Sequence, residues 1–357
     1  MPWRQGLRRA PILFFLVGPA LGVSGQEARP PRKELVINYG GGGWKEGQVQ
    51  EPCILANPKD PGKLIMIFAG AAPGGGSGAI GKAWADLSDP FTWHEDPANP
   101  ILKPDPAVPF ESESIRLDAV LYHEGRDEYW IYYTGHGGKT GVDAIGLATC
   151  ATGKDGYGGV TPANIKRHPG NPILSAGGPG REDERFVSQG AVFREGGIWY
   201  SFYSYRTATE TLPGIRLATS SDGKAWKKEP GPDLLSAGPE SKYYEWHQVY
   251  KIDGRYVMML EAYNGGTRWR ANAATSTMLT RGWTKAPIDL IDQTRWPGYS
   301  DDSQFHVATP AIYKLNGKWH LYVQAARSGF YSSQRWAMYA IEADEVMKKV
   351  LALSDGK

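Results

Sequence analysis

Five similar segments follow one another along this chain, and this internal repeat limits the fold more than any other feature of the sequence. Each copy has an apolar strand, a short turn, and a second strand rich in aromatic residues. Turn pairs such as Asp253-Gly254 and Asn316-Gly317 accept the positive φ angles that tight hairpins need. Each copy is therefore predicted to be a β-hairpin, and the copies align at positions 51, 118, 189, 246 and 309.

Two further strands extend each hairpin. The third strand is rich in Ala and Thr, and the weaker fourth strands lie near Trp93, Lys166, Trp226 and Trp283. For the last copy, residues 35–39 near the N-terminus are expected to supply the fourth strand. Four strands in each copy, at a period of about 60 residues, are typical of a β-propeller. We therefore predict an all-β fold, a five-bladed β-propeller that residues 26–357 form as a single domain.

The first 25 residues have the pattern of a secretory signal peptide. Residues 1–9 carry three Arg and no acid, residues 10–23 are apolar, and the small pair Ser24-Gly25 follows. The apolar run is shorter than the ~20 residues that a membrane-spanning helix needs. The pattern predicts a secreted or periplasmic protein with no membrane span after cleavage; the alternative is an uncleaved N-terminal anchor.

Charge and cysteine content narrow the partners and cofactors. Removal of the three Arg of the signal segment changes the formal net charge from +2 to −1, and no basic block remains, so no nucleic-acid partner is expected. The two cysteines, Cys53 and Cys150, fall at different depths of different copies. A disulfide therefore stays open, and two buried unpaired side chains are favoured. No zinc-type spacing occurs. No cofactor is expected to be required, although an axial calcium or sodium ion would be compatible with this fold.

Carboxylates recur where the first strands of the copies begin. In a propeller these starts converge on one axis, and here they are Glu51, Asp118, Gln189, Glu245 and Thr309. Several carboxylates in one cavity raise one another's pKa values, and two carboxyl groups of unequal pKa are what glycosidic bond cleavage needs. The alternative for any one of them is a solvated or paired loop acid.

Basic and aromatic residues gather at the ends of the second strands and before the first strands. Arginine forks bind carboxylate or sulfate well, and Tyr or Trp beside them can stack on sugars. These residues suggest an anionic sugar, with salt bridges between blades as the alternative. His247 and His306 are expected near the axis as contacts to a hydroxyl or a metal, or as hydrogen-bonded scaffold. The candidate substrate contacts are Gln189, Arg116, Arg185, His247, His306, Arg206, Arg268 and Arg327.

These residues resemble the five-bladed propeller glycoside hydrolases, especially family 43 and its relatives in families 32, 62, 117 and 130. The segment that starts at Glu245 matches the family 43 general-acid motif in its Glu, its Tyr250-Lys251 pair and its Gly254. The resemblance implies that Glu245 is the general acid and that Glu51, in a Glu-Pro pair, is the general base. It also implies inversion, with the two carboxyl groups ~6.5–9.5 Å apart.

The third carboxylate of that family is missing at its usual position. It tunes the acid from the start of blade 3, where this chain has Gln189, whereas Asp118 lies one blade earlier. We therefore expect Asp118 to tune Glu245. The predicted function is a glycoside hydrolase acting on a poly- or oligosaccharide. A glycoside phosphorylase, a polysaccharide lyase, or a non-catalytic glycan-binding propeller are the alternatives.

Overall fold

The computed structural model describes residues 31–41, 43–73, 76–138, 142–177, 183, 185–207, 214–238, 243–263, 269–291, 306–326 and 335–353. The chain divides into two compact units, Met1–Pro31 and Arg32–Lys357. The predicted signal peptide, residues 1–25, lies outside the described residues. All the helices and strands described below belong to the second unit.

Antiparallel strands dominate this unit, which confirms the predicted all-β class. They pair into three four-stranded sheets and one nine-stranded sheet. The first sheet contains β2 (Gln48–Ala56), β3 (Lys63–Ala71), β4 (Gly78–Asp86) and β5 (Trp93–Glu95). The second contains β15 (Tyr243–Ile252), β16 (Arg255–Tyr263), β17 (Trp269–Ser276) and β18 (Thr284–Lys285). The third contains β19 (His306–Leu315), β20 (Lys318–Ala326), β21 (Ala337–Glu342) and β1 (Lys33–Ile37).

The nine-stranded sheet consists of two successive antiparallel sets. One set is β6 (Ser114–His123), β7 (Glu128–Gly137), β8 (Val142–Ala151) and β9 (Lys166–Arg167). The other is β10 (Phe186–Glu195), β11 (Ile198–Arg206), β12 (Gly214–Ser220), β13 (Lys227–Lys228) and β14 (Leu235–Ser236). A single parallel pair, Phe186 with Asp143, joins the two sets.

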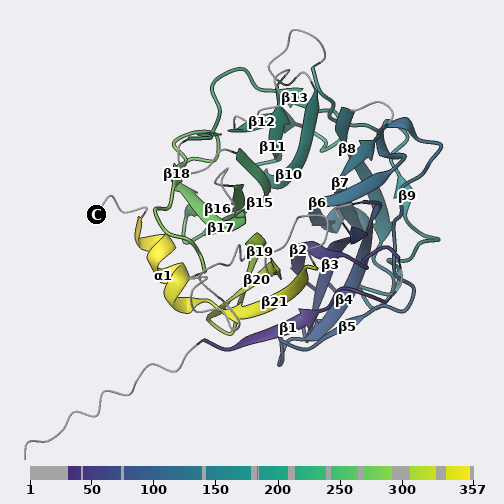
Figure 1. Ribbon diagram of the computed structural model, residues 1–357, viewed down its shortest axis with the longest axis horizontal. Helices are drawn as coiled ribbons and strands as arrows, with labels where there is room; N and C mark the ends of the chain where they lie inside the picture. The colour runs from purple at the N-terminus through teal and green to yellow at the C-terminus, as the bar shows by residue number, and fades with distance from the viewer. Residues whose placement is uncertain are drawn as a thin grey trace, which may run out of the picture. The chain divides into compact units, whose positions relative to one another are not determined.

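The first strands of the successive sets, which we call the inner strands, are β2, β6, β10, β15 and β19. Each contacts the next, and β19 contacts β2. They lie nearest the middle of the unit in Figure 1. The N-terminal strand β1 pairs with β21, as expected, although it begins two residues earlier than the predicted segment. Only one α-helix is described, α1 (Asp344–Ala352), which packs against β17 and β20. No described helix is long and apolar enough to cross a membrane.

Two of the predicted hairpin turns form as expected. Asp253 and Asn316 adopt φ angles of 50° and 48°, and each is followed by a glycine with φ of 80°. The turn after β6 differs from the predicted Glu-Gly pair. A short 3-10 turn over Glu124–Arg126 is followed by Asp127 with a φ of 53°, so this loop is longer. The longer loop leaves the pairing of β6 and β7 intact.

Aromatic side chains of the second strands fill the spaces between neighbouring sheets. Tyr129 and Tyr133 of β7 pack in one cluster with Ile65 and Ile67 of β3, and all four are fully buried. Trp130 of β7 stacks on Trp199 of β11 with 5.1 Å between the ring centroids. Cys53 and Cys150 are buried and free. The core therefore joins the sheets through apolar and aromatic contacts.

A β-bulge interrupts every inner strand at the same point of its pairing with the second strand. The pairing shifts between residues 50 and 53, 117 and 119, 188 and 191, 244 and 247, and 308 and 311. The residues in these bulges include the predicted strand-start positions Glu51, Asp118, Gln189, Glu245 and Thr309. A bulge changes the direction of a side chain, and bulges are common beside active sites. The repeat thus brings equivalent positions to equivalent places in the fold.

Candidate active site

A small cavity opens between the bulges of the inner strands and the ends of the second strands. Carboxylate, amide, hydroxyl, guanidinium and indole groups all face it. The lining residues are Gln50, Glu51, Arg116, Glu245, Glu261, Trp269, Thr309, Gln324 and Trp336. They come from β2, β6, β15, β16, β17, β19, β20 and the residue before β21. The structure therefore brings Glu51 and Glu245 to one cavity, although they are far apart in the sequence.

Glu51 lines this cavity and is 1% exposed. Its φ of 58° lies in the left-handed region, a strained conformation for glutamate that typically persists at functional sites. Its Oε2 accepts the Leu117 N–H at 2.8 Å, and its Oε1 lies 3.5 Å from Nη1 of Arg116. Burial raises the pKa of Glu51 to about 7, and Arg116 and the Leu117 N–H oppose this rise. Glu51 thus changes its charge near neutral pH.

Glu245 lies in the bulge of β15 and is half-buried. The next residue, Trp246, is fully buried, and its Nε1–H donates to the Leu117 carbonyl oxygen at 3.1 Å. The Leu117 N–H binds Glu51, so the backbone of this one residue of β6 connects the bulges that contain Glu51 and Glu245. In addition, the Ser204 hydroxyl donates to the Glu245 carbonyl oxygen at 3.2 Å. These contacts hold the backbone of Glu245 in place while its carboxyl group faces the cavity.

Glu261 is the third carboxyl group of the cavity, and it is not among the residues predicted from the strand starts. It lies on β16, opposite the two bulged residues Glu245 and Trp246. Burial raises the pKa of Glu261 well above its usual value, and the charges of Glu245 and Glu51 raise it further. The sequence does contain a signal: Glu261 is an acid within the otherwise apolar run 257–262.

Asp118, the residue predicted to tune the acid, is not among the residues that line the cavity. It occupies the bulge of β6, but it is fully buried and both its carboxylate oxygens accept hydrogen bonds from the Thr134 hydroxyl at 2.8 and 3.0 Å. The bulge of β6 leaves one residue unpaired, whereas the bulge of β2 leaves two, Glu51 and Pro52.

The two predicted histidines support the site from behind its lining. His247 is fully buried, and its two ring nitrogens each lie 2.7 Å from a backbone carbonyl oxygen, of Glu245 and of Phe202. Burial lowers the pKa of His247. His306 Nδ1 accepts the Trp269 N–H at 3.2 Å, and its ring packs on Trp336. His247 is therefore held by the backbone of two strands, and His306 contacts two residues of the lining.

Among the predicted basic contacts, Arg116 lines the cavity. The Arg206 guanidinium lies over the Phe186 ring, 4.8 Å from its centroid, and Arg185 is exposed; neither residue belongs to the lining. Arg268 and Arg327 lie outside the described residues, as does the side chain of Gln189. An aromatic group adjoins the cavity instead. Tyr263 stacks on Tyr243 with 4.8 Å between centroids and lies 5.0 Å from Trp269.

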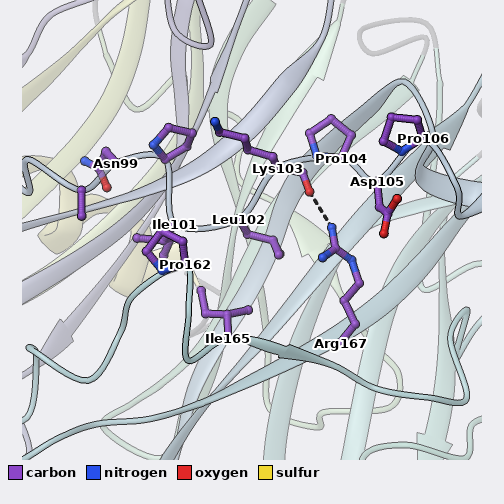
Figure 2. Close-up of a pocket in the computed structure, with 12 residues that line it drawn as sticks. Asn99, Ile101, Leu102, Lys103, Pro104, Asp105, Pro106, Pro162, Ile165 and Arg167 are labelled. Atoms are coloured by element: carbon purple, nitrogen blue, oxygen red, sulfur yellow. Dashed lines mark hydrogen bonds between the residues drawn. The ribbon is translucent and has the colours of Figure 1, made fainter.

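A second hollow lies on another part of the unit and has different chemistry (Figure 2). It is lined by residues 98–106 together with Pro162, Ile165 and Arg167. Arg167 is already engaged there, since it donates to the Lys103 carbonyl oxygen and to Glu111. This hollow contains none of the predicted site residues. Among the described residues, no group of His, Cys, Asp and Glu side chains is arranged to hold a metal ion.

No family model matches this chain. It is 25% identical over 223 residues to an uncharacterized protein of Mycobacterium tuberculosis, a match that covers 60% of this chain and 69% of the relative.

Solved structures of glycoside hydrolases share the fold of this chain. The catalytic domain of a family 62 α-L-arabinofuranosidase from Coprinopsis cinerea is 12% identical, with a TM-score of 0.61 over 88% of this chain and 97% of that one. A thermostable family 43 glycoside hydrolase is 15% identical, with a TM-score of 0.56 over 85% and 91% of the two chains. An α-L-arabinanase from Cellvibrio cellulosa is 13% identical, with a TM-score of 0.54 over 85% and 92%. The predicted resemblance to β-propeller glycoside hydrolases is therefore confirmed for the fold.

Proposed function

We propose that this chain is a glycoside hydrolase in which Glu51 and Glu245 form the acid–base pair. The observation that carries this proposal is that the bulges of β2 and β15 direct two carboxyl groups to one cavity on a fold shared with glycoside hydrolases. We further propose that the two sets of the nine-stranded sheet are separate blades, so that the propeller has five. We also propose that residues 1–25 are a secretory signal peptide and that the mature chain is exported.

The surroundings of the two residues suit different roles. Both oxygens of Glu51 face donors, the Leu117 N–H and Arg116, and these favour the carboxylate that a base must be. Glu245 is more exposed and is assigned as the acid that protonates the glycosidic oxygen. Glu51 removes a proton from the water that attacks the anomeric carbon. The bond to the leaving sugar breaks as the proton from Glu245 arrives, and inversion follows.

The pH dependence of kcat/KM tests the role of Glu51. Because the base must be charged, activity should fall on the acid side of about pH 7, the pKa of Glu51. The positive charge of Arg116 lowers that pKa, so Arg116→Gln should move the acid limb to higher pH. Activity on the acid side should then fall by roughly three- to tenfold. Arg194→Gln, an exposed arginine at the far end of β10, serves as the control. An unshifted limb in Arg116→Gln would remove Glu51 as the base.

The charge of the cavity favours a neutral sugar over the anionic one suggested by the sequence. Among the described lining residues, three carboxyl groups face one guanidinium, and Arg116 is already paired with Glu51. Two buried lining groups, Gln50 Nε2 and Trp336 Nε1, have no hydrogen-bond partner among the described residues. Such groups can donate to sugar hydroxyls. They therefore suit a neutral, hydroxyl-rich substrate.

A screen of the purified protein against neutral and anionic polysaccharides tests this preference, with products identified by mass. We expect release of neutral sugars. Rates on sulfated or uronic substrates should be lower than on neutral substrates by roughly tenfold or more, because like charges in a partly buried site repel. Faster cleavage of the anionic substrates would contradict the neutral-sugar proposal and would restore the anionic one. The same products separate the alternatives, since a phosphorylase yields a sugar phosphate and a lyase an unsaturated sugar.

A further inference from the structure

Leu117 of β6 contacts both catalytic bulges through its backbone. Its N–H donates to Oε2 of Glu51 at 2.8 Å, and its carbonyl oxygen accepts the Nε1–H of Trp246 at 3.1 Å. β6 ends the strand order of its sheet, and in an antiparallel strand the N–H and C=O of one residue point to the same side. Both groups of Leu117 therefore point away from β7, toward β2 and β15.

The hydrogen bond between Trp246 and Leu117 joins two groups that both need a partner. Trp246 and Leu117 are fully buried. A buried indole N–H needs an acceptor and a buried backbone carbonyl needs a donor, so each group satisfies the other. Separation of the two would leave both unpaired in a place with little water, which is costly. The bond therefore resists any movement of β15 away from β6.

A second side chain of β15 makes the same kind of contact. Gln248, two residues after Trp246, donates through Nε2 to the carbonyl oxygen of Asp118. Two successive carbonyl groups of β6, those of Leu117 and Asp118, thus bind two side chains of β15. Neither Trp246 nor Gln248 is among the residues on which the resemblance to family 43 rests.

These contacts bear on catalysis because Glu245 directly precedes Trp246. The carboxyl group of Glu51 and the backbone beside Glu245 are both fixed to Leu117. An inverting reaction needs carboxyl groups ~6.5–9.5 Å apart, so that a water molecule fits, and an error of about 1 Å in placement can lower the rate roughly a hundredfold. We propose that Trp246, supported by Gln248, is a positioning residue that sets the separation between Glu245 and Glu51. This inference rests on the proposed function.

The test is Trp246→Phe, which keeps an aromatic ring but removes the N–H. If substrate is cleaved, kcat should fall by roughly tenfold or more with little change in KM, because misplacement of Glu245 weakens the transition state and not the binding of substrate. Trp283→Phe is the matched control. Trp283 is buried outside the lining, and its Nε1–H donates to the Leu279 carbonyl oxygen at 3.0 Å. This control should leave kcat and KM unchanged.

Amide hydrogen exchange, followed by NMR on leucine-labelled protein, tests the contact without substrate. The Leu117 N–H exchanges only when β6 moves away from Glu51, and the bond from Trp246 opposes that movement. In Trp246→Phe the Leu117 N–H should therefore exchange roughly tenfold faster than in the wild type. In Trp283→Phe its exchange should stay at the wild-type rate.

Gln248→Met provides a second variant if Trp246→Phe does not fold. It removes the other donor to β6 and should lower kcat and speed exchange of the Leu117 N–H, each by roughly threefold. Unchanged exchange of that N–H, a loss confined to KM, or equal effects of Trp246→Phe and Trp283→Phe would overturn the inference. Faster exchange in Trp246→Phe, together with no cleavage by the wild type, would support the contact and contradict the proposed function instead.

Discussion

Replacement of Glu245 by Gln is expected to lower the turnover of a glycosidic substrate by roughly 10²–10⁴-fold, the usual effect of losing an acid–base group. Gln keeps the shape of the side chain but has no proton to give to the leaving oxygen. The fold should be retained, because the described contacts that hold this bulge use the backbone of Glu245 and the side chain of Trp246. Steady-state kinetics and circular dichroism on the same preparation provide the measurement.

Substrates with good leaving groups supply the control for that variant. An activated aryl glycoside needs little protonation, so its cleavage by Glu245→Gln should be impaired much less than that of a natural glycoside. Unchanged turnover of the natural glycoside would remove Glu245 from the acid role. Equal losses on both substrates would assign Glu245 to another step.

Glu51→Gln is expected to lower hydrolysis about as much as Glu245→Gln does. It should also change how the free energy of unfolding depends on pH. Burial holds the folded-state pKa of Glu51 at about 7, above the ordinary 4.5. Its contribution to stability is therefore present below about pH 4.5 and is lost as pH rises through 7. The shift corresponds to about 3 kcal/mol. The variant lacks this titration, so its free energy of unfolding should fall by less between these two pH values.

Urea unfolding at both pH values measures this difference directly. The comparison between pH values cancels any effect of the substitution on stability that does not depend on pH. Glu111→Gln is a suitable reference, since that buried carboxyl pairs with Arg167. An identical pH dependence in wild type and Glu51→Gln would contradict the raised pKa of Glu51.

The repeat made the positions of Glu51 and Glu245 predictable from sequence. Equivalent strand starts fall in equivalent bulges, so the repeat pattern alone places these two distant carboxylates near each other. The residue types of the Asp253 and Asn316 turns were equally informative, because their positive φ angles have a direct steric cause.

The third carboxyl group could not be assigned correctly in the same way. Alignment of strand starts selects Asp118, but that side chain accepts hydrogen bonds from Thr134 and does not line the cavity, which the repeat pattern does not reveal. Glu261 lies on a second strand, opposite a bulge, and only the pairing register places it beside Glu245. The strand pattern also could not show which predicted arginines reach the cavity. Arg206, for example, lies over the Phe186 ring and is not part of the lining.

The screen of neutral oligosaccharides, carried out in isotopically labelled water, tests the central claim most directly. If Glu51 activates water and Glu245 protonates the leaving oxygen, each cleavage places one labelled oxygen at the new reducing end, and the Glu51→Gln and Glu245→Gln variants release almost no product. Unlabelled products, a sugar phosphate, or tight glycan binding by the wild-type protein without any cleavage would contradict the account.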